Sequence, residues 1–508
     1  MKLGLLAAGV LAVLAMVLLV LDEGDPSLSA LVIVSLIALY NAWTRPLRVF
    51  VMMFFFAVLT MENPLERPFA GIWQTAFAPI GGVIFDTWNK LLPIDALRFA
   101  GIDVVLAVLA VGLATRGLVG DASNRRDRLP NAQPMQIGLL ACFIAVAWLE
   151  LYGLARGGDF KSSLWQVREL IWMPVVGFIL CSTLRGPRDQ MTVGVVLVAA
   201  AVYRVLAGAY FWVFICRPLD FRPPYVTSHA DTVLFVSVMI ICVAVYWEYK
   251  NLFSLALNVV MLPLICVGIY MNNRRLAYVD FFVALAAMLF IARRQVKVRV
   301  LRPVIFVAPF ALMYIAVGWN SGSAIFKPVA SISSMFSKDD RSSGTRDIED
   351  YNLATTLKQS PLIGSGFGHE YIEVVKADDI STIFPLYRYI GHNSVLWLWS
   401  IGGFVGFSAF WFFLMAAVFL AARSYKLADS ISDRVAALSV VGVVVVYELQ
   451  AFGDMGVINW TSVWILMAAM AVVSKLATST GAWPAVSTAR RPVQIQKDVG
   501  VTPLESGA

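Results

Sequence analysis

Apolar runs long enough to span a lipid bilayer follow one another along almost the whole chain, from residue 3 to residue 477. A run of roughly 20 apolar residues can cross the membrane as a helix, because the helix satisfies its own backbone polar groups. The sequence therefore predicts roughly 12 to 14 transmembrane helices. With 59% hydrophobic and only 14% charged residues, the chain is too apolar for a soluble protein. We expect an all-α integral membrane protein.

One long polar stretch, residues 319–391, interrupts this pattern and ends where a new apolar run begins. We expect residues 1–477 to form a polytopic membrane domain, with residues 319–391 inserted in it as a long loop. Residues 478–508 are rich in Pro, Ser, Thr, Ala and Gly and contain no further apolar run. That composition predicts a disordered tail.

Basic residues predict the orientation of the bundle, since short loops rich in Lys and Arg stay on the cytoplasmic side. Alternate loops carry them: Arg45, Arg48, Arg116, Arg125, Arg126, Arg128, Arg185, Arg188, Lys250, Arg293, Arg294, Lys297, Arg299, Arg302, Arg423, Lys426 and Arg434. Both termini are then cytoplasmic, and the loop 319–391 faces outward. The net charge of +7 follows largely from these anchoring loops, so it does not indicate nucleic-acid binding.

A second set of arginines lies at the outward ends, against this bias: Arg168, Arg217, Arg222, Arg274, Arg275, Arg341, Arg346 and Arg388. Arg binds phosphate through two parallel hydrogen bonds while it stays ionised. The set therefore favours a ligand with a phosphate or pyrophosphate group at the membrane surface. A salt bridge within the loops is the alternative for any single arginine. The adjacent Arg274 and Arg275 favour an anionic ligand more strongly, because they lie at the mouth of two apolar helices.

The chain has only three histidines, and all three lie on the outward side. His392 is followed by Asn393 and an apolar helix, which places it at the membrane surface, where a lipid-borne substrate presents its head group. Histidine is the side chain best suited to take a proton near neutral pH, so His392 is the candidate general base. For His229 the alternative is a structural hydrogen bond to Asp231 or to a backbone carbonyl. For His369 it is an exposed position in the loop.

The stretch Gly364 to Gly368 carries three alternating glycines but lacks the strand and the spacing of a nucleotide-binding motif. Its glycines allow a sharp turn or a close backbone approach to a ligand. We expect no metal and no cofactor. The outward carboxylate pairs Asp339–Asp340 and Asp378–Asp379 have no histidine at ligand spacing, and magnesium needs several converging oxygen ligands.

Several of these features occur in one order. Arg274 and Arg275 lie at an outward helix start, and an Arg-led helix from Arg346 to Leu357 follows in the long loop. Next come Pro361 to Gly368, then His392 and Asn393 opening a helix with Gly402 and Gly403 downstream. From about residue 272 to residue 403 the chain thus resembles the O-antigen ligase and Wzy-type polysaccharide polymerase superfamily. It departs from the family pattern at Asn273, where a Ser often precedes the Arg, and at Ser400, where an acidic residue often stands.

The resemblance implies transfer of a glycan from undecaprenyl diphosphate to an acceptor hydroxyl, on the periplasmic face of the bacterial inner membrane. It implies that His392 is the base and that Arg346, with either Arg274 or Arg275, binds the diphosphate. Further candidate substrate contacts are Asn393, Gly364 and Gly366, followed by Arg222, His229, His369 and Arg388.

The expected partners are the lipid-linked glycan, an acceptor glycan and membrane lipid, together with a flippase and a chain-length regulator. The reaction we expect is polymerisation of exopolysaccharide or O-antigen repeat units. The first alternative is ligation to a lipid A core or protein acceptor. A lipid-linked oligosaccharide flippase or other transporter is the alternative from another class, and it should place its charges in the mid-membrane helices.

Overall fold

The structure is a computed structural model. It describes residues 2–21, 24, 27–43, 47–63, 80–85, 100–119, 129–219, 223, 225–333, 341–377, 379–381 and 384–484. Within these ranges the regular elements are helices, and no strand is present. This confirms the predicted all-α membrane fold.

The helices of the N-terminal part are α1 (Lys2–Leu21), α2 (Ser27–Trp43), α3 (Leu47–Thr60), α4 (Ile80–Phe85), α5 (Gly101–Val119), α6 (Gln133–Ala155), α7 (Phe160–Thr183) and α8 (Pro187–Tyr210). A π-helical turn, η3 (Phe211–Cys216), extends α8. The middle of the chain forms α9 (Asp231–Tyr249), α10 (Leu252–Asn272), α11 (Leu276–Ile291) and α12 (Arg294–Gly318). The remaining elements are η4 (Ala324–Phe326), α13 (Lys327–Ser333), α14 (Arg341–Gln359), α15 (Ser394–Leu427), α16 (Ile431–Gly453), η6 (Gly456–Ile458) and α17 (Trp460–Ser479).

Nine helices in the described part of the chain have the length and apolar composition needed to cross a membrane. They are α6, α7, α8 with η3, α9, α10, α12, α15, α16 and α17. Three shorter apolar helices, at Ser29–Tyr40, Leu47–Thr60 and Leu276–Ile291, bring the set to twelve. The protein is therefore a multi-pass membrane protein.

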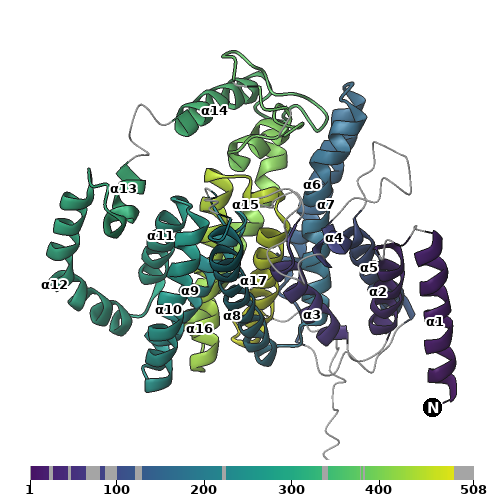
Figure 1. Cartoon of the computed structure of the whole chain (residues 1–508), viewed down its shortest axis with the longest axis horizontal. Helices are drawn as coiled ribbons and strands as arrows, with labels where there is room; N and C mark the ends of the chain where they lie inside the picture. Colours follow the sequence, from purple (N-terminus) through teal and green to yellow (C-terminus); the bar gives the residue numbers. More distant parts are fainter. Residues whose placement is uncertain are drawn as a thin grey trace, which may run out of the picture.

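Helix α16 lies in the middle of the bundle and packs against α9, α11, α15 and α17, while α15 also packs against α6. Valine and alanine line much of the buried face of α16, so its neighbours can approach closely. Helices α12 and α1 lie at opposite edges of the bundle (Figure 1). Most apolar side chains of α12 are exposed, as expected for a helix that faces lipid.

The reversals between helices bring two sets of loops to opposite ends of the bundle. At one end, Arg293 donates to the carbonyls of Lys426 and Ala428, and Arg434 pairs with Glu248 at 2.7 Å. We call this the basic end. At the other end lie the turns after residues 224, 272 and 453, together with the segment between α12 and α15. We call this the site end, because it holds His392 and Arg274.

Helix α12 ends at Gly318 and α15 begins at Ser394, with the predicted polar loop 319–391 between them. Part of this loop enters a kink in α15 at Gly403, where φ is 54°. The backbone N–H groups of Phe404 and Val405 donate to the carbonyls of Pro361 and Leu362, at 2.8 and 3.0 Å. The loop thus pairs backbone groups that the kink removes from the regular helix, and such pairing is needed in an apolar bundle.

Glycine is required at the two closest points of this contact. A Cβ atom on Gly364, whose φ is 78°, would lie 2.2 Å from the carbonyl oxygen of Ile401. A Cβ on Gly403 would lie 2.5 Å from the backbone nitrogen of Ile363. Both residues also have positive φ, which side chains disfavour. The glycine stretch thus lies close against the backbone of α15.

The predicted tail begins beside the C-terminal end of α17, which is Ser479. Trp483 donates its backbone N–H to the carbonyl of Ala477 at 2.9 Å, so the chain still contacts the helix there. Residues 485–508 lie outside the described residues.

Candidate active site

His392 lies one residue before the N-cap of α15. The side chain of Asn393 caps this helix by accepting a hydrogen bond from the backbone N–H of Leu396 at 3.1 Å. Such a cap satisfies an N–H group that has no partner within the helix. It also fixes the direction in which the chain enters α15, and so the position of His392 at the site end.

Glu349 of α14 holds the His392 ring. Its Oε2 atom lies 3.0 Å from Nδ1 of His392 and accepts the backbone N–H of the same residue at 3.1 Å. The Glu349 side chain is 6% exposed and that of His392 is 29% exposed, so the carboxylate lies beneath a partly accessible imidazole. With Nδ1 donating to Glu349, Nε2 is the nitrogen that can accept a proton from a ligand. A carboxylate behind a histidine is the arrangement that orients a general base.

The hydrogen bond from Glu349 raises the pKa of His392 above its ordinary value, against the opposing effect of burial. The carboxylates of Glu349 and Asp454 also raise it through their charge, while Arg346 lowers it. Activity that needs the neutral imidazole should therefore fall as the pH drops through this raised pKa.

Replacing Glu349 with glutamine should move that acidic limb of the pH–rate profile to lower pH, because the main cause of the raised pKa is removed. The maximal rate should also fall, since His392 becomes a weaker base. Initial rates of glycan transfer between pH 5 and pH 9 measure both effects. An acidic limb that stayed in place would show that it reports a group other than His392.

Helix α14 presents three charged side chains on one face, because Arg346, Glu349 and Asp350 are spaced by three and four residues. Asp350 accepts a hydrogen bond from Nδ2 of Asn393 at 3.3 Å. Two neighbouring residues of α14 thus contact two neighbouring residues of the His392 turn. These contacts dock α14 on the start of α15 and bring Arg346 within electrostatic range of His392.

Arg274 approaches the same region from the turn between α10 and α11. Its guanidinium lies 5.2 Å from the centre of the Tyr225 ring, a cation–π contact. Burial lowers the pKa of Arg274, Asp454 and Tyr225 oppose this effect, and the positive charge of Arg346 adds to it. Two arginines thus lie close enough to repel each other, as expected where an anion is to be bound.

Asp454 caps the C-terminus of α16 and faces His229. Its Oδ2 atom lies 3.4 Å from Nδ1 of His229. Burial would raise the pKa of Asp454, but the hydrogen bond and charge of His229, together with Arg274, hold it below its ordinary range. The hypothesis that His229 pairs with Asp231 is wrong. Asp231 instead forms a buried ion pair with Arg204, at 2.6 Å.

Residues 260–411 match a family model described as O-antigen ligase. Over this segment the chain is similar to the O-antigen ligase family. The match runs from α10 into α15 and includes Arg274, Arg346, Glu349 and His392. It confirms the resemblance seen in the sequence and identifies glycan transfer of the ligase or polymerase type as the activity of the family. No curated protein matches the chain.

The other candidate residues of this O-antigen ligase segment have structural partners. Nε2 of His369 lies 3.0 Å from the carbonyl of Gly153, and Arg388 pairs with Glu373 at 3.2 Å within the loop. Gly366 donates its N–H to Ile401. Contact of these residues, or of Gly364, with substrate stays a prediction. Arg222 lies outside the described residues.

The sequence analysis missed two residues of the site and the role of a third. Asp454 and Tyr225 belong to no motif and lie far from His392 along the chain. In the sequence, Glu349 is only one of several carboxylates in the polar loop. The spacing of three residues between Arg346 and Glu349 was a usable signal, because it places both side chains on one face of α14.

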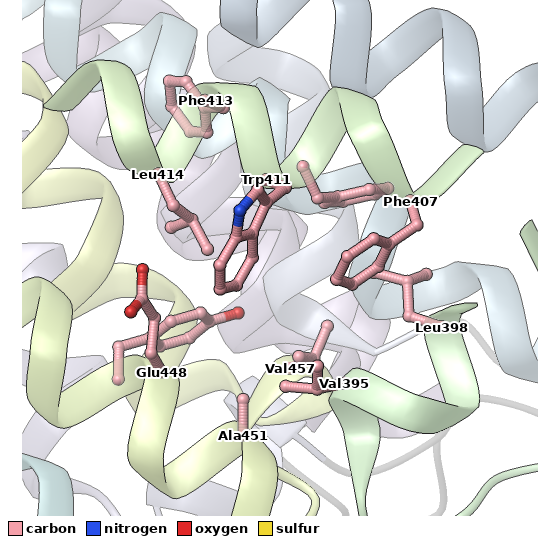
Figure 2. Close-up of a pocket in the computed structure, with 11 residues that line it drawn as sticks. Val395, Leu398, Phe407, Trp411, Phe413, Leu414, Glu448, Ala451 and Val457 are labelled. Carbon is pink, nitrogen blue, oxygen red and sulfur yellow. The ribbon is translucent and has the colours of Figure 1, made fainter. Parts of the chain in front are cut away.

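An apolar cavity lies between α15 and α16 (Figure 2). Val395, Phe407, Trp411 and Glu448 are among the residues that line it. Its volume is about 40 Å³. By the same measure a single water molecule takes up roughly 10–15 Å³, so the cavity has room for only a few waters. The cavity is therefore too small for a sugar.

Proposed function

We propose that this protein transfers a glycan from undecaprenyl diphosphate to an acceptor hydroxyl on the periplasmic face of the bacterial inner membrane, and that it polymerises exopolysaccharide or O-antigen repeat units. One observation carries the proposal. A histidine backed by a buried carboxylate lies in the same electrostatic cluster as Arg274 and Arg346, at one end of the bundle. A base and fixed cations are what this transfer needs, because a lipid diphosphate is already a good leaving group.

In the proposed reaction, Nε2 of His392 takes the proton of the acceptor hydroxyl. The hydroxyl oxygen forms a bond to the anomeric carbon of the donor glycan. The bond from that carbon to the diphosphate oxygen breaks, and its electron pair leaves with undecaprenyl diphosphate. Arg274 and Arg346 stabilise the negative charge that grows on the diphosphate. Direct attack by the hydroxyl inverts the configuration of the anomeric carbon.

Ligation is the second candidate function, and the description of the matching family favours it. The two reactions differ only in the acceptor. A purified protein given lipid-linked repeat units alone should produce a ladder of polymer if it is a polymerase. A ligase should form product only when a lipid A core or protein acceptor is added. A flippase and a chain-length regulator are the partners we propose for the polymerase.

Transfer should require no divalent metal, because the arginines supply the positive charge at the leaving group. The described residues contain no group of three or more His, Cys, Asp or Glu side chains that could hold a metal ion. Asp339, Asp340 and Asp378 lie outside these residues, so the test must be functional. Purified protein in nanodiscs, given lipid-linked glycan and acceptor, should work equally well with excess EDTA. Loss of transfer that magnesium or manganese restores would contradict the arginine-only mechanism.

The same assay separates an enzyme from a transporter. Asp280 of α11 is fully buried in a membrane helix, and neither carboxylate oxygen has a hydrogen-bond partner in the described structure. Such a carboxylate is the kind of feature expected of a transporter. A transporter moves its substrate between compartments and leaves the glycosidic bonds unchanged. New glycosidic bonds made in detergent, where there are no compartments, would establish an enzyme.

The site end should face the periplasm, as the basic loops predict. Ser333 of α13, within the loop 319–391, is a suitable position for a reporter. In a cysteine-free background, Ser333→Cys should react with a membrane-impermeant maleimide on intact spheroplasts. A cysteine at Ser430, at the basic end, is the matched control and should react only after permeabilisation. The reverse pattern would overturn the proposed topology.

A further inference from the structure

A second histidine–carboxylate pair lies at the site end, and both of its members lie outside the segment that matches the O-antigen ligase family. His229 is 43% exposed and Asp454 is 13% exposed. The pair therefore repeats the arrangement of His392 and Glu349, with a partly accessible imidazole held by a more buried carboxylate. In both pairs the carboxylate faces Nδ1, which leaves Nε2 for a ligand.

Asp454 connects this pair to the first one. The hydroxyl of Ser394 donates to the backbone carbonyl of Asp454 at 3.2 Å. Since Ser394 is two residues from His392, the end of α16 lies directly against the turn that carries the base. The Asp454 carboxylate also interacts electrostatically with both His392 and Arg274.

Tyr225 connects the second pair to the arginine that we assign to the diphosphate. The ring of His229 meets that of Tyr225 at 81°, with 5.1 Å between the ring centres. The guanidinium of Arg274 lies over the same ring. His229 is therefore on the Arg274 side of the site, whereas His392 is held on the α14 side by Glu349.

A buried polar network fixes the position of His229. The amide nitrogen of Asn272 donates to Oγ1 of Thr227 at 2.9 Å and to the carbonyl of Ser228 at 2.6 Å. The N–H of Ser228 donates to Asp231, which is held in turn by Arg204. These bonds tie the turn that carries His229 to the end of α10, next to Arg274. Such support pre-organises a reacting group.

We propose that His229, held by Asp454, is the general acid of this site and donates a proton to the departing diphosphate. The proposal rests on the proposed function. As the bond between the anomeric carbon and the diphosphate oxygen breaks, that oxygen takes the electron pair and receives the proton from Nε2 of His229. His392 has meanwhile gained the acceptor proton. Exchange with water then returns one proton to His229 and removes one from His392, so the cycle needs no other reactant.

The test compares His229→Gln and Asp454→Asn with Asp433→Asn, a matched control at the basic end of α16. Transfer is measured against pH, and binding of undecaprenyl diphosphate to protein in nanodiscs is measured separately. Loss of the general acid should lower kcat roughly 100-fold in His229→Gln, with a smaller change in KM. The alkaline limb of the pH–rate profile should disappear. Binding of undecaprenyl diphosphate below neutral pH should weaken about 10-fold, because a charged donor is lost.

Asp454→Asn should lower kcat less than His229→Gln does, because it removes the carboxylate that holds the imidazole and leaves the imidazole in place. Among the described residues, Asp454 pairs with His229, and Tyr225, which also contacts Arg274, packs against the His229 ring. Asp433→Asn should match the wild type in rate, pH profile and melting temperature.

Three results would overturn the proposal. The first is a His229→Gln variant with unchanged kcat and alkaline limb while the wild type transfers glycan. The second is a loss of activity that is equal at every pH and accompanied by a lower melting temperature, which indicates a structural role. The third result concerns a wild type that itself transfers no glycan, in which case the proposed function fails. In that case unchanged binding of undecaprenyl diphosphate to His229→Gln would also rule out the contact between His229 and the diphosphate.

Discussion

Replacing His392 with alanine should lower glycan transfer roughly 100-fold to 10,000-fold, the usual contribution of a general base. The reason is geometric. His392 is the imidazole whose Nδ1 is held by the buried Glu349, and whose turn is fixed by the Asn393 cap. Initial rates with lipid-linked glycan and acceptor, at equal amounts of purified protein, measure the effect. Near-normal rates would move the role of the base to another group.

The alanine variant takes the imidazole away from the buried Glu349 and leaves it the backbone N–H of residue 392, and a buried carboxylate that loses a partner destabilises a fold. His392→Gln is the matched variant, because its side-chain amide can still donate to Glu349 but does not accept a proton near neutral pH. Both variants should lose activity to a similar degree, and His392→Gln should keep a wild-type melting temperature. Activity that returned with glutamine would show that His392 only supports Glu349 and the adjoining turn.

Replacing Arg274 with lysine should lower transfer roughly 10-fold to 100-fold, although the charge is kept. Lysine cannot reproduce the planar guanidinium that binds two phosphate oxygens at once, and a hydrogen bond to a charged group is worth about 1.5–3 kcal/mol. Arg274 lies over Tyr225 and within range of Asp454 and Arg346. We therefore expect Arg274, rather than Arg275, to be the residue that contacts the diphosphate.

Arg275→Lys should lower transfer less than Arg274→Lys does. Because the two residues are adjacent in one turn, each variant is a control for the other. Arg299→Lys at the basic end, where Arg299 donates to the carbonyl of Trp247, is the control for a charge-conserving change far from the site. KM for the donor should rise in Arg274→Lys, because the lost contact forms already in the bound substrate. Full activity in both single variants of the pair would argue against diphosphate binding by either residue.

The sequence predicts the membrane architecture because an apolar run of sufficient length has one stable structure in a bilayer. It also predicts where His392 lies, since the boundary between a polar loop and an apolar helix is visible residue by residue. These are local properties. The end of α12 at Gly318 and the start of α15 at Ser394 have the same origin.

The partners of the histidines depend on packing and could not be predicted in this way. His229 has a carboxylate two residues away in Asp231, and the sequence suggests that pair. Arg204 of α8 binds Asp231 instead, through a contact between helices that no spacing reveals. Asp454 reaches His229 only because α16 packs against α9, which begins two residues after His229. The acid–base groups of the site come from four separate parts of the chain.

The insertion of the loop into the kink of α15 determines how the molecule can fold and move. Because Pro361, Leu362 and Gly366 pair with backbone groups of α15, the loop is not a detachable domain laid over a finished bundle. Removing it would leave the carbonyl of Ile401 and the N–H groups of Phe404 and Val405 without these partners among apolar side chains. The loop and the membrane helices should therefore unfold in one transition. Helix α14, in contrast, contacts the start of α15 through the side chains of Glu349 and Asp350 at the His392 turn, so we expect the opening that admits a glycan to involve α14.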